Sequence, residues 1–136
     1  MTDEIDTVER RRRQRFLATR HGERCFWAMI DGRRVPLCDL SVEGFAMPSD
    51  SPPPADRSFE FVLVREGVPD EICGRARVVN YLHGVSGGQA GCLFEQIEGD
   101  GRSRLVEWLT THVLMSACVP ISEQDADAIV SGPSLI

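Results

Sequence analysis

Short apolar runs separated by turn-forming residues dominate the first three quarters of the chain. These runs cover residues 25–30, 35–40, 59–65, 71–82 and 90–97. Each has the length and composition of a β-strand. Asp31-Gly32 and Glu66-Gly67 lie between neighbouring runs, and Asp-Gly is a strong hairpin signal. Three prolines within 49–56 and three glycines within 83–89 predict loops.

The run 71–82 is the longest, and its alternation predicts which of its side chains share a face. Successive side chains of a strand point to opposite faces of the sheet. We therefore expect Val78 and Asn80 on one face, and Arg77, Val79 and Tyr81 on the other.

The last third of the chain changes to helical periodicity. Apolar residues recur at helical spacing after residue 102, at Leu105, Trp108, Leu109 and Val113. They predict a helix whose apolar stripe seals one end of a small barrel, and Pro120 is expected to stop it. A short second helix is expected over 122–130, with Ser122 as its cap and acidic residues in its first turn.

The predicted fold is therefore mainly β: a small antiparallel six-stranded β-barrel with a C-terminal helix and a flexible N-terminal arginine arm. We divide the chain into a flexible N-terminus (1–9), a domain that includes the helix (10–116) and an acidic C-terminal tail with a short helix (117–136).

Composition adds limits on function. The chain has 136 residues, of which 42% are hydrophobic and 26% charged, as in a single globular domain. Its formal net charge of -6 disfavours general binding to nucleic acid or to an anionic membrane. The basic residues are all arginine, a side chain suited to bidentate phosphate recognition. There is no apolar run long enough for membrane insertion and no secretory signal, so we expect a cytoplasmic protein.

Cysteine and histidine spacing argues against a metal site. The five cysteines and three histidines form no closely spaced ligand pairs, so no metal or other cofactor is expected. The cysteines are interpreted as reduced thiols of a cytoplasmic protein.

Two separate groups of residues carry candidate binding chemistry. Arg11 and Arg15 precede the first predicted strand and can hold phosphate oxygens or lie flat against a purine. Asp39 and Ser41 are two apart at a strand end, where we expect them to face the same side. A carboxylate accepts from the amino and imino edge of guanine. Gly44 is expected to allow a positive φ and the close approach of a ligand.

These groups, in this order, resemble the motifs of the PilZ domain family, whose members are cyclic di-GMP receptors. The family pattern is RxxxR, followed about twenty to thirty residues later by (D/N)xSxxG. Here 11–15 reads RRRQR and 39–44 reads DLSVEG. The resemblance spans about residues 9–115 and implies a stand-alone, single-domain member.

The resemblance also implies roles for the residues. Arg11 and Arg15 would hold guanine and phosphate, and Asp39 and Ser41 would read a guanine edge. Gly44 would permit the close approach of the ligand.

Three further residues extend the implied site. In the family, an arginine at the position of Arg10 goes with two intercalated cyclic di-GMP molecules. Arg12 would add a phosphate contact. Tyr81, or its strand neighbours Arg77 and Val79, would supply a stacking surface.

Simpler interpretations remain open for each feature. The arginine run is also typical of a solvated arm, and Asp39 and Ser41 of ordinary turn residues. Tyr81 is equally compatible with a place in the core, and Trp27 and Trp108 are interpreted as core anchors.

The function expected from the resemblance is a receptor and adaptor, not an enzyme. Cyclic di-GMP would fold the arm over the barrel, and the new surface would meet an effector protein in bacterial motility, exopolysaccharide or biofilm control. The chain itself would be a monomer or weak dimer. The alternative is a degenerate PilZ interaction module that binds no nucleotide. An enzyme is disfavoured because the sequence has no nucleophile-and-base pair and no phosphate loop.

Overall fold

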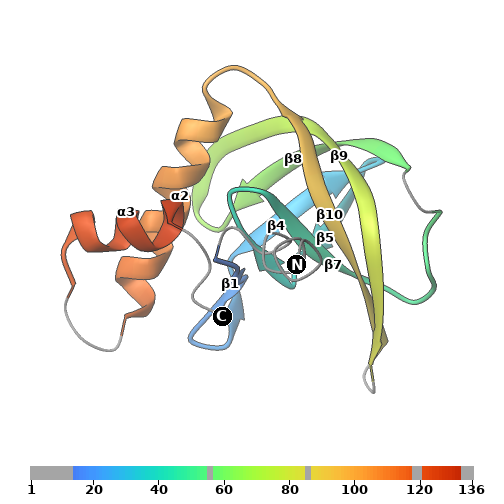
Figure 1. Cartoon of the computed structure of the whole chain (residues 1–136), viewed down its shortest axis with the longest axis horizontal. Coiled ribbons are helices and arrows are strands. Elements are labelled where there is room, and N and C mark those ends of the chain that lie inside the picture. Colours follow the sequence, from blue (N-terminus) through green and yellow to red (C-terminus); the bar gives the residue numbers. More distant parts are fainter. Residues whose placement is uncertain (1–13, 55–56, 85–86, 118–120, 133–136) are drawn as a thin grey trace, which may run out of the picture.

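The computed structural model describes residues 14–54, 57–84, 87–117 and 121–132, and it is mainly β with two helices near the C-terminus (Figure 1). The strands are β1 (Phe16–Leu17), β2 (Thr19–Arg20), β3 (Glu23–Arg24), β4 (Phe26–Ile30), β5 (Arg33–Pro36), β6 (Asp39–Leu40), β7 (Gly44–Ser49), β8 (Ser58–Arg65), β9 (Val68–Gly84) and β10 (Gly87–Ile97). The helices are α2 (Gly101–Ser116) and α3 (Glu123–Ser131).

Eight of these strands form one curled antiparallel sheet. Its order is β1-β6-β7-β10-β9-β8-β4-β5, and β2 and β3 form a separate two-stranded ribbon. Within the described residues the end strands β1 and β5 each pair with a single neighbour, so the expected closed six-stranded barrel is not confirmed. The mainly β architecture with a C-terminal helix is confirmed, as Figure 1 shows.

The predicted hairpin turns are confirmed. Asp31 and Gly32 join β4 to β5 with φ values of 52° and 76°, as the mirror-image turns of two-residue hairpins require. Gly67, with φ of 75°, joins β8 to β9.

The prediction of a loop over residues 83–89 is wrong for most of this range. β9 continues to Gly84 and β10 begins at Gly87, and the two strands pair along this stretch. The glycines serve close packing here: a Cβ at Gly88 would collide with the phenol of Tyr81. Glycine therefore marks an extended hairpin at this point instead of a break in the sheet.

Helix α2 covers the open end of the curled sheet, as its apolar stripe predicted (Figure 1). Leu105 and Leu109 are fully buried, and Trp108 is nearly so. Trp108 stacks on Phe26 of β4 with ring centroids 6.4 Å apart. The prediction of Trp108 as a core anchor is confirmed. Trp27 is only half-buried, so the prediction of Trp27 as a core anchor is wrong; the guanidinium of Arg34 lies over its ring, 4.2 Å from the centroid.

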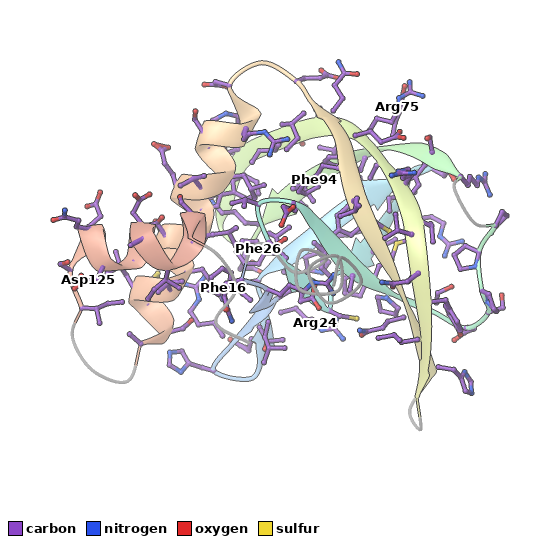
Figure 2. The ribbon with its side chains drawn as sticks, in the orientation of Figure 1. Phe16, Arg24, Phe26, Arg75, Phe94 and Asp125 are labelled. Atoms are coloured by element: carbon purple, nitrogen blue, oxygen red, sulfur yellow. The ribbon has the colours of Figure 1, made fainter. Side chains whose placement is uncertain are left out.

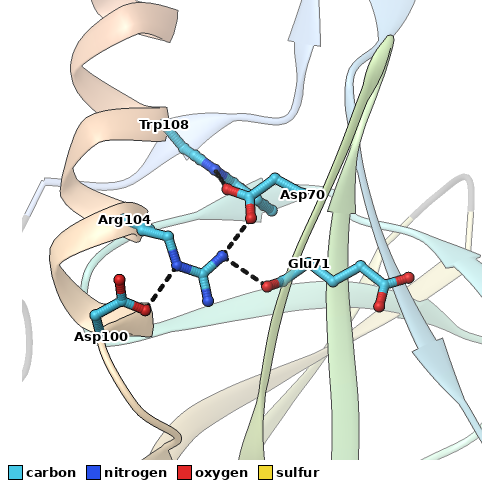
Figure 3. Close-up of polar contacts among 5 residues, drawn as sticks. All are labelled: Asp70, Glu71, Asp100, Arg104 and Trp108. Atoms are coloured by element: carbon cyan, nitrogen blue, oxygen red, sulfur yellow. Dashed lines mark hydrogen bonds and ion pairs between the residues drawn. The ribbon is translucent and has the colours of Figure 1, made fainter.

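A polar cluster fixes α2 to the start of β9 (Figure 3). Arg104 donates to the carboxylates of Asp70 and Asp100 and to the carbonyl of Glu71. The indole Nε1 of Trp108 donates to the other oxygen of Asp70 at 3.0 Å. Because Asp100 lies on the same helix turn as Arg104, the cluster sets both the position and the rotation of the helix.

The second helix forms as predicted and packs on the first. Ser122 caps α3, because its hydroxyl accepts a hydrogen bond from the backbone N–H of Asp125. The backbone N–H of Ser122 in turn donates to the carboxylate of Asp125. This reciprocal pair is a capping box. Ala126 and Val130 are fully buried, so α3 is part of the folded unit.

Candidate functional site

A short strand pairing brings Arg15, the last residue of the arginine motif, next to the second candidate motif. β1 pairs antiparallel with β6, with Phe16 opposite Leu40 and Leu17 opposite Asp39. Arg15 therefore lies one residue before a strand whose partner runs directly into Ser41. Two segments that are more than twenty residues apart in the sequence meet at this edge of the sheet.

Only part of the arginine motif can be located. Arg15 is half-buried at the entrance to β1. Arg10, Arg11 and Arg12 lie outside the described residues, so their predicted contacts stay predictions.

Asp39 is the first residue of β6 and is half-buried. It pairs with Leu17 on one side and with Ala46 of β7 on the other. One carboxylate oxygen, Oδ1, is buried, so only part of this carboxylate faces solvent. The backbone of Asp39 is thus fixed by two neighbouring strands, which presents the carboxylate in a defined direction.

Ser41 forms the turn between β6 and β7. Its hydroxyl accepts from the backbone N–H of Glu43 at 3.1 Å and of Gly44 at 3.2 Å, and its side chain is buried. The Ser41 N–H in turn donates to the Gly44 carbonyl at 2.9 Å. This is the ordinary role of serine in a turn. The hydroxyl shapes the turn that follows Asp39, and a direct contact with guanine stays a prediction.

Gly44 is required by the packing of the sheet, and its role in the approach of a ligand stays a prediction. Its φ is not positive, so that expectation is wrong. A Cβ at Gly44 would instead collide with the carbonyl oxygen of Cys92, on the neighbouring strand β10. The close approach that glycine permits is therefore between two strands of the sheet.

Tyr81 points to the opposite face from the one that strict alternation predicts. Between Val78 and Asn80, β9 advances two residues while β10 advances one, from Cys92 to Gly91. This β-bulge inverts the alternation beyond it. Tyr81 therefore shares the face of its cross-strand partner Ala90, which is fully buried.

The hydroxyl of Tyr81 is also engaged. It reaches across Gly88 and donates to the carbonyl of Ser49 at 3.0 Å, and its ring lies 6.5 Å from that of His83. The ring is half-buried, so one part of it contacts protein and another faces solvent. The proposed stacking role is compatible with this position but is not tested by it.

Sequence reasoning missed a hollow of about 580 Å³ beside the site. Its lining includes Arg24, Cys38, Leu82, His83 and Gln89. Cys38 immediately precedes Asp39, and Arg24 donates to the Leu37 carbonyl at 3.2 Å. The sequence did not distinguish Arg24 from the other arginines. Arg24 lies in β3 (Figure 2), and the pairing of β3 with β2 positions it at the hollow.

The thiol in this hollow is held in its neutral form. Burial raises the pKa of Cys38, and the carboxylate of Asp39 raises it further, while Arg24 acts in the opposite sense. A neutral thiol is a poor nucleophile. The hollow therefore offers a guanidinium, an amide and an imidazole, which suit binding rather than covalent chemistry.

Among the described residues, no group of three His, Cys, Asp or Glu side chains is arranged to hold a metal ion. None of the helices in these parts of the chain is long and apolar enough to span a membrane.

Comparison with known proteins gives a fold relationship only. No family model and no curated protein matches the sequence. Among solved structures, the chain is similar to MrkH, described as a novel c-di-GMP-dependent transcription regulatory factor, with a TM-score of 0.58 and 22% identity over 74% of this chain and 49% of that one. It is also similar to the Bacillus subtilis inhibitor of motility MotI (DgrA), with a TM-score of 0.50 and 12% identity over 66% of this chain and 46% of that one. The chain thus spans about half the length of both proteins, and shares their fold over that part.

Proposed function

We propose that this chain is a PilZ-type receptor for cyclic di-GMP that acts as an adaptor for a partner protein. One observation carries the proposal: β1 pairs with β6, so Arg15 lies beside the segment that runs from Asp39 into the turn at Ser41. The last residue of the arginine motif is thereby adjacent in space to the second motif, which supports a single ligand site. The fold shared with a c-di-GMP-dependent regulator supports the same proposal.

The chemistry of the site suits a guanine dinucleotide. Arg15 and the arginines before it supply bidentate donors for phosphate or a flat surface for a purine. Asp39 supplies an acceptor for the guanine N–H edge, and Ser41 holds the turn that orients it. With Arg10 in the arm, we expect two intercalated ligand molecules.

The proposed action is binding without catalysis, followed by contact with an effector protein. Ligand phosphates offset the repulsion among the clustered arginines, so ligand binding favours an ordered arrangement of the arm over the sheet. The downstream process would be motility, exopolysaccharide or biofilm control.

Calorimetric titration of matched variants tests the site. Arg15→Ala is expected to weaken cyclic di-GMP binding about tenfold or more, because a charge-assisted hydrogen bond contributes about 1.5–3 kcal/mol. Asp39→Asn, which keeps the side-chain volume, is expected to weaken it as well. Arg75→Ala is the control, since Arg75 is exposed and projects far from Phe16 in the view of Figure 2. Equal affinities for Arg15→Ala and Arg75→Ala would reject this site.

The same titration separates the receptor from the degenerate interaction module. In that alternative the wild-type chain binds no cyclic di-GMP, and the intact motif residues serve only the fold.

A further inference from the structure

The β-bulge that turns Tyr81 to the inner face also determines which side chains share a face with Asp39. Asp39 pairs with Ala46 of β7, and Ala46 pairs with Gly91 of β10. Gly91 in turn pairs with Asn80 of β9. Directly paired residues point to the same face of a sheet. The exposed Asn80 therefore lies on the same outer face as Asp39, and Tyr81 lies on the opposite face.

The next row of side chains on this outer face lines the hollow beside the candidate site. Two residues away on each strand, Gln89 of β10 pairs with Pro48 of β7 and with Leu82 of β9. All three side chains line the hollow of about 580 Å³. Leu82 is 56% exposed, although it is a large apolar side chain. The hollow is therefore a continuation of the surface that carries Asp39.

The distance across this surface is that of a molecule with two bases. In the sheet, β10 lies two strands from β6, and β9 lies three strands from it. Neighbouring strands are about 4.8 Å apart, so Gln89 and Leu82 are roughly 10–14 Å from the strand of Asp39. A cyclic dinucleotide that is held at Asp39 through one guanine has a second guanine to place on this surface.

The charge of the hollow favours a ligand that is rich in acceptors. Among the described residues that line it there is no carboxylate, and Arg24 supplies a guanidinium. The cleft between α2 and α3 is the opposite case, because Glu107, Glu123 and Asp127 line it. In a chain with a net charge of -6, this local balance distinguishes the hollow as a place for an anionic or acceptor-rich group.

Arg24 is positioned at the hollow by the fold. It lies in β3, which pairs with β2, and its Nη1 donates to the carbonyl of Leu37 at 3.2 Å. A guanidinium carries five N–H donors, so this bond leaves others for a ligand. Arginine donates bidentately to the O6 and N7 acceptors of guanine, whereas adenine presents an amino donor in place of O6. Arg24 can therefore distinguish the two purines.

We infer that the hollow binds a second guanine of cyclic di-GMP, with Arg24 donating to its O6 and N7 and Leu82 packing against its ring. This inference rests on the proposed function, because it states where the base that does not contact Asp39 is bound. Arg24 is then a specificity-determining residue outside both motifs. The two guanines are recognised through different edges, the N–H edge at Asp39 and the O6 and N7 edge at Arg24.

Calorimetric titration with two ligands tests the role of Arg24. The ligands are cyclic di-GMP and the cyclic dinucleotide in which adenine replaces one guanine. The wild type is expected to bind cyclic di-GMP about fivefold or more tightly than the mixed dinucleotide, the discrimination that one bidentate contact provides. In Arg24→Gln the affinity for cyclic di-GMP should fall to that of the mixed dinucleotide, which should itself bind nearly as it does to the wild type.

The matched control is Arg75→Gln, which makes the same change of charge. Arg75 is exposed and lies far from Arg24 in the view of Figure 2, so both affinities should equal those of the wild type. An equal loss for the two dinucleotides in Arg24→Gln would show that Arg24 acts on phosphate or on the fold, and would overturn the inference. Unchanged binding of cyclic di-GMP by Arg24→Gln would overturn it and leave the proposed function in place. A wild type that binds neither dinucleotide would reject the proposed function, and the inference with it.

The packing of the base is tested at β9. Leu82→Ala should weaken the binding of both dinucleotides about fourfold or more, the effect of removing one buried CH₂ group. Met115→Ala is the control, because Met115 is also 56% exposed but lies on α2. Equal affinities for the Leu82→Ala and Met115→Ala variants would show that no base packs on Leu82 and would overturn the placement in the hollow.

Discussion

Gly44 shows how one residue of the candidate site serves the fold. The strands β7 and β10 approach so closely there that a side chain would meet the carbonyl of Cys92. Backbone atoms of a central strand cannot move aside as a flexible side chain can.

Gly44→Ala is therefore expected to destabilise the fold by about 3 kcal/mol, because overpacking against backbone forces the strands apart. Chemical denaturation measures the loss. Asp50→Ala, at an exposed position after β7, is the control and should change stability little. A Gly44→Ala protein as stable as this control would show that the two strands are not held at this distance.

Two substitutions of Tyr81 distinguish the role of its hydroxyl from the role of its ring. Tyr81→Phe removes the bond to the Ser49 carbonyl and should cost about 1 kcal/mol of stability. If the ring stacks on the ligand, Tyr81→Phe keeps cyclic di-GMP affinity and Tyr81→Leu weakens it by about 1–3 kcal/mol. Equal affinities for the Phe and Leu variants would exclude the stacking role.

The residue types at the site could be predicted from the sequence, but not all of their surroundings. Asp39 and Ser41 were predicted from their spacing at a strand end and from the resemblance to the family motif. The inverted face of Tyr81 depends on a bulge at Val79, which exists only relative to β10. Arg24 reaches the neighbouring hollow through a tertiary arrangement, and no local pattern in the sequence indicates it.

At the scale of elements, length decides what the sequence reveals. β8 and β9 are long enough for their apolar alternation to be recognised. β1 and β6 have two residues each, which is too short for any periodicity. These two short strands nevertheless bring Arg15 next to Asp39 and Ser41, so this pairing was not predictable from local pattern.

The capping box of α3 was predictable in part, and it carries a quantitative expectation. Ser122→Ala should destabilise the protein by about 1 kcal/mol, because the Asp125 N–H loses its side-chain acceptor. Thermal unfolding monitored by circular dichroism measures this. Ser131→Ala, at the exposed last position of the same helix, is the matched control. Identical melting temperatures for the two variants would contradict the capping role.

At the scale of the whole molecule, His112 connects helix α2 to β1 and β4. It is buried on α2, packs edge-on against Phe26 and lies 2.9 Å from the Leu17 carbonyl, next to the candidate site. Burial lowers the pKa of His112 below its ordinary value of 6.5, and the charge of Arg20 lowers it further, against the opposing effect of the Leu17 bond.

The lowered pKa of His112 predicts a pH dependence of stability. The unfolded chain binds a proton at His112 more readily than the folded chain does. The free energy of unfolding therefore keeps its full value above pH 6.5 and decreases as the pH falls below 6.5. Denaturation curves between pH 7.5 and about 5 should therefore show a steeper loss for the wild type than for His112→Gln, which keeps a donor for Leu17. Parallel pH profiles would show that His112 titrates as it does in the unfolded chain.

The central claim is that residues from two distant segments form one cyclic di-GMP site. Calorimetric titration of the wild-type chain with cyclic di-GMP tests it most directly. We expect saturable binding with a dissociation constant of about 10 µM or tighter, and two ligand molecules per chain. One ligand per chain would reject the intercalated pair, and no binding at tens of micromolar ligand would contradict the claim itself.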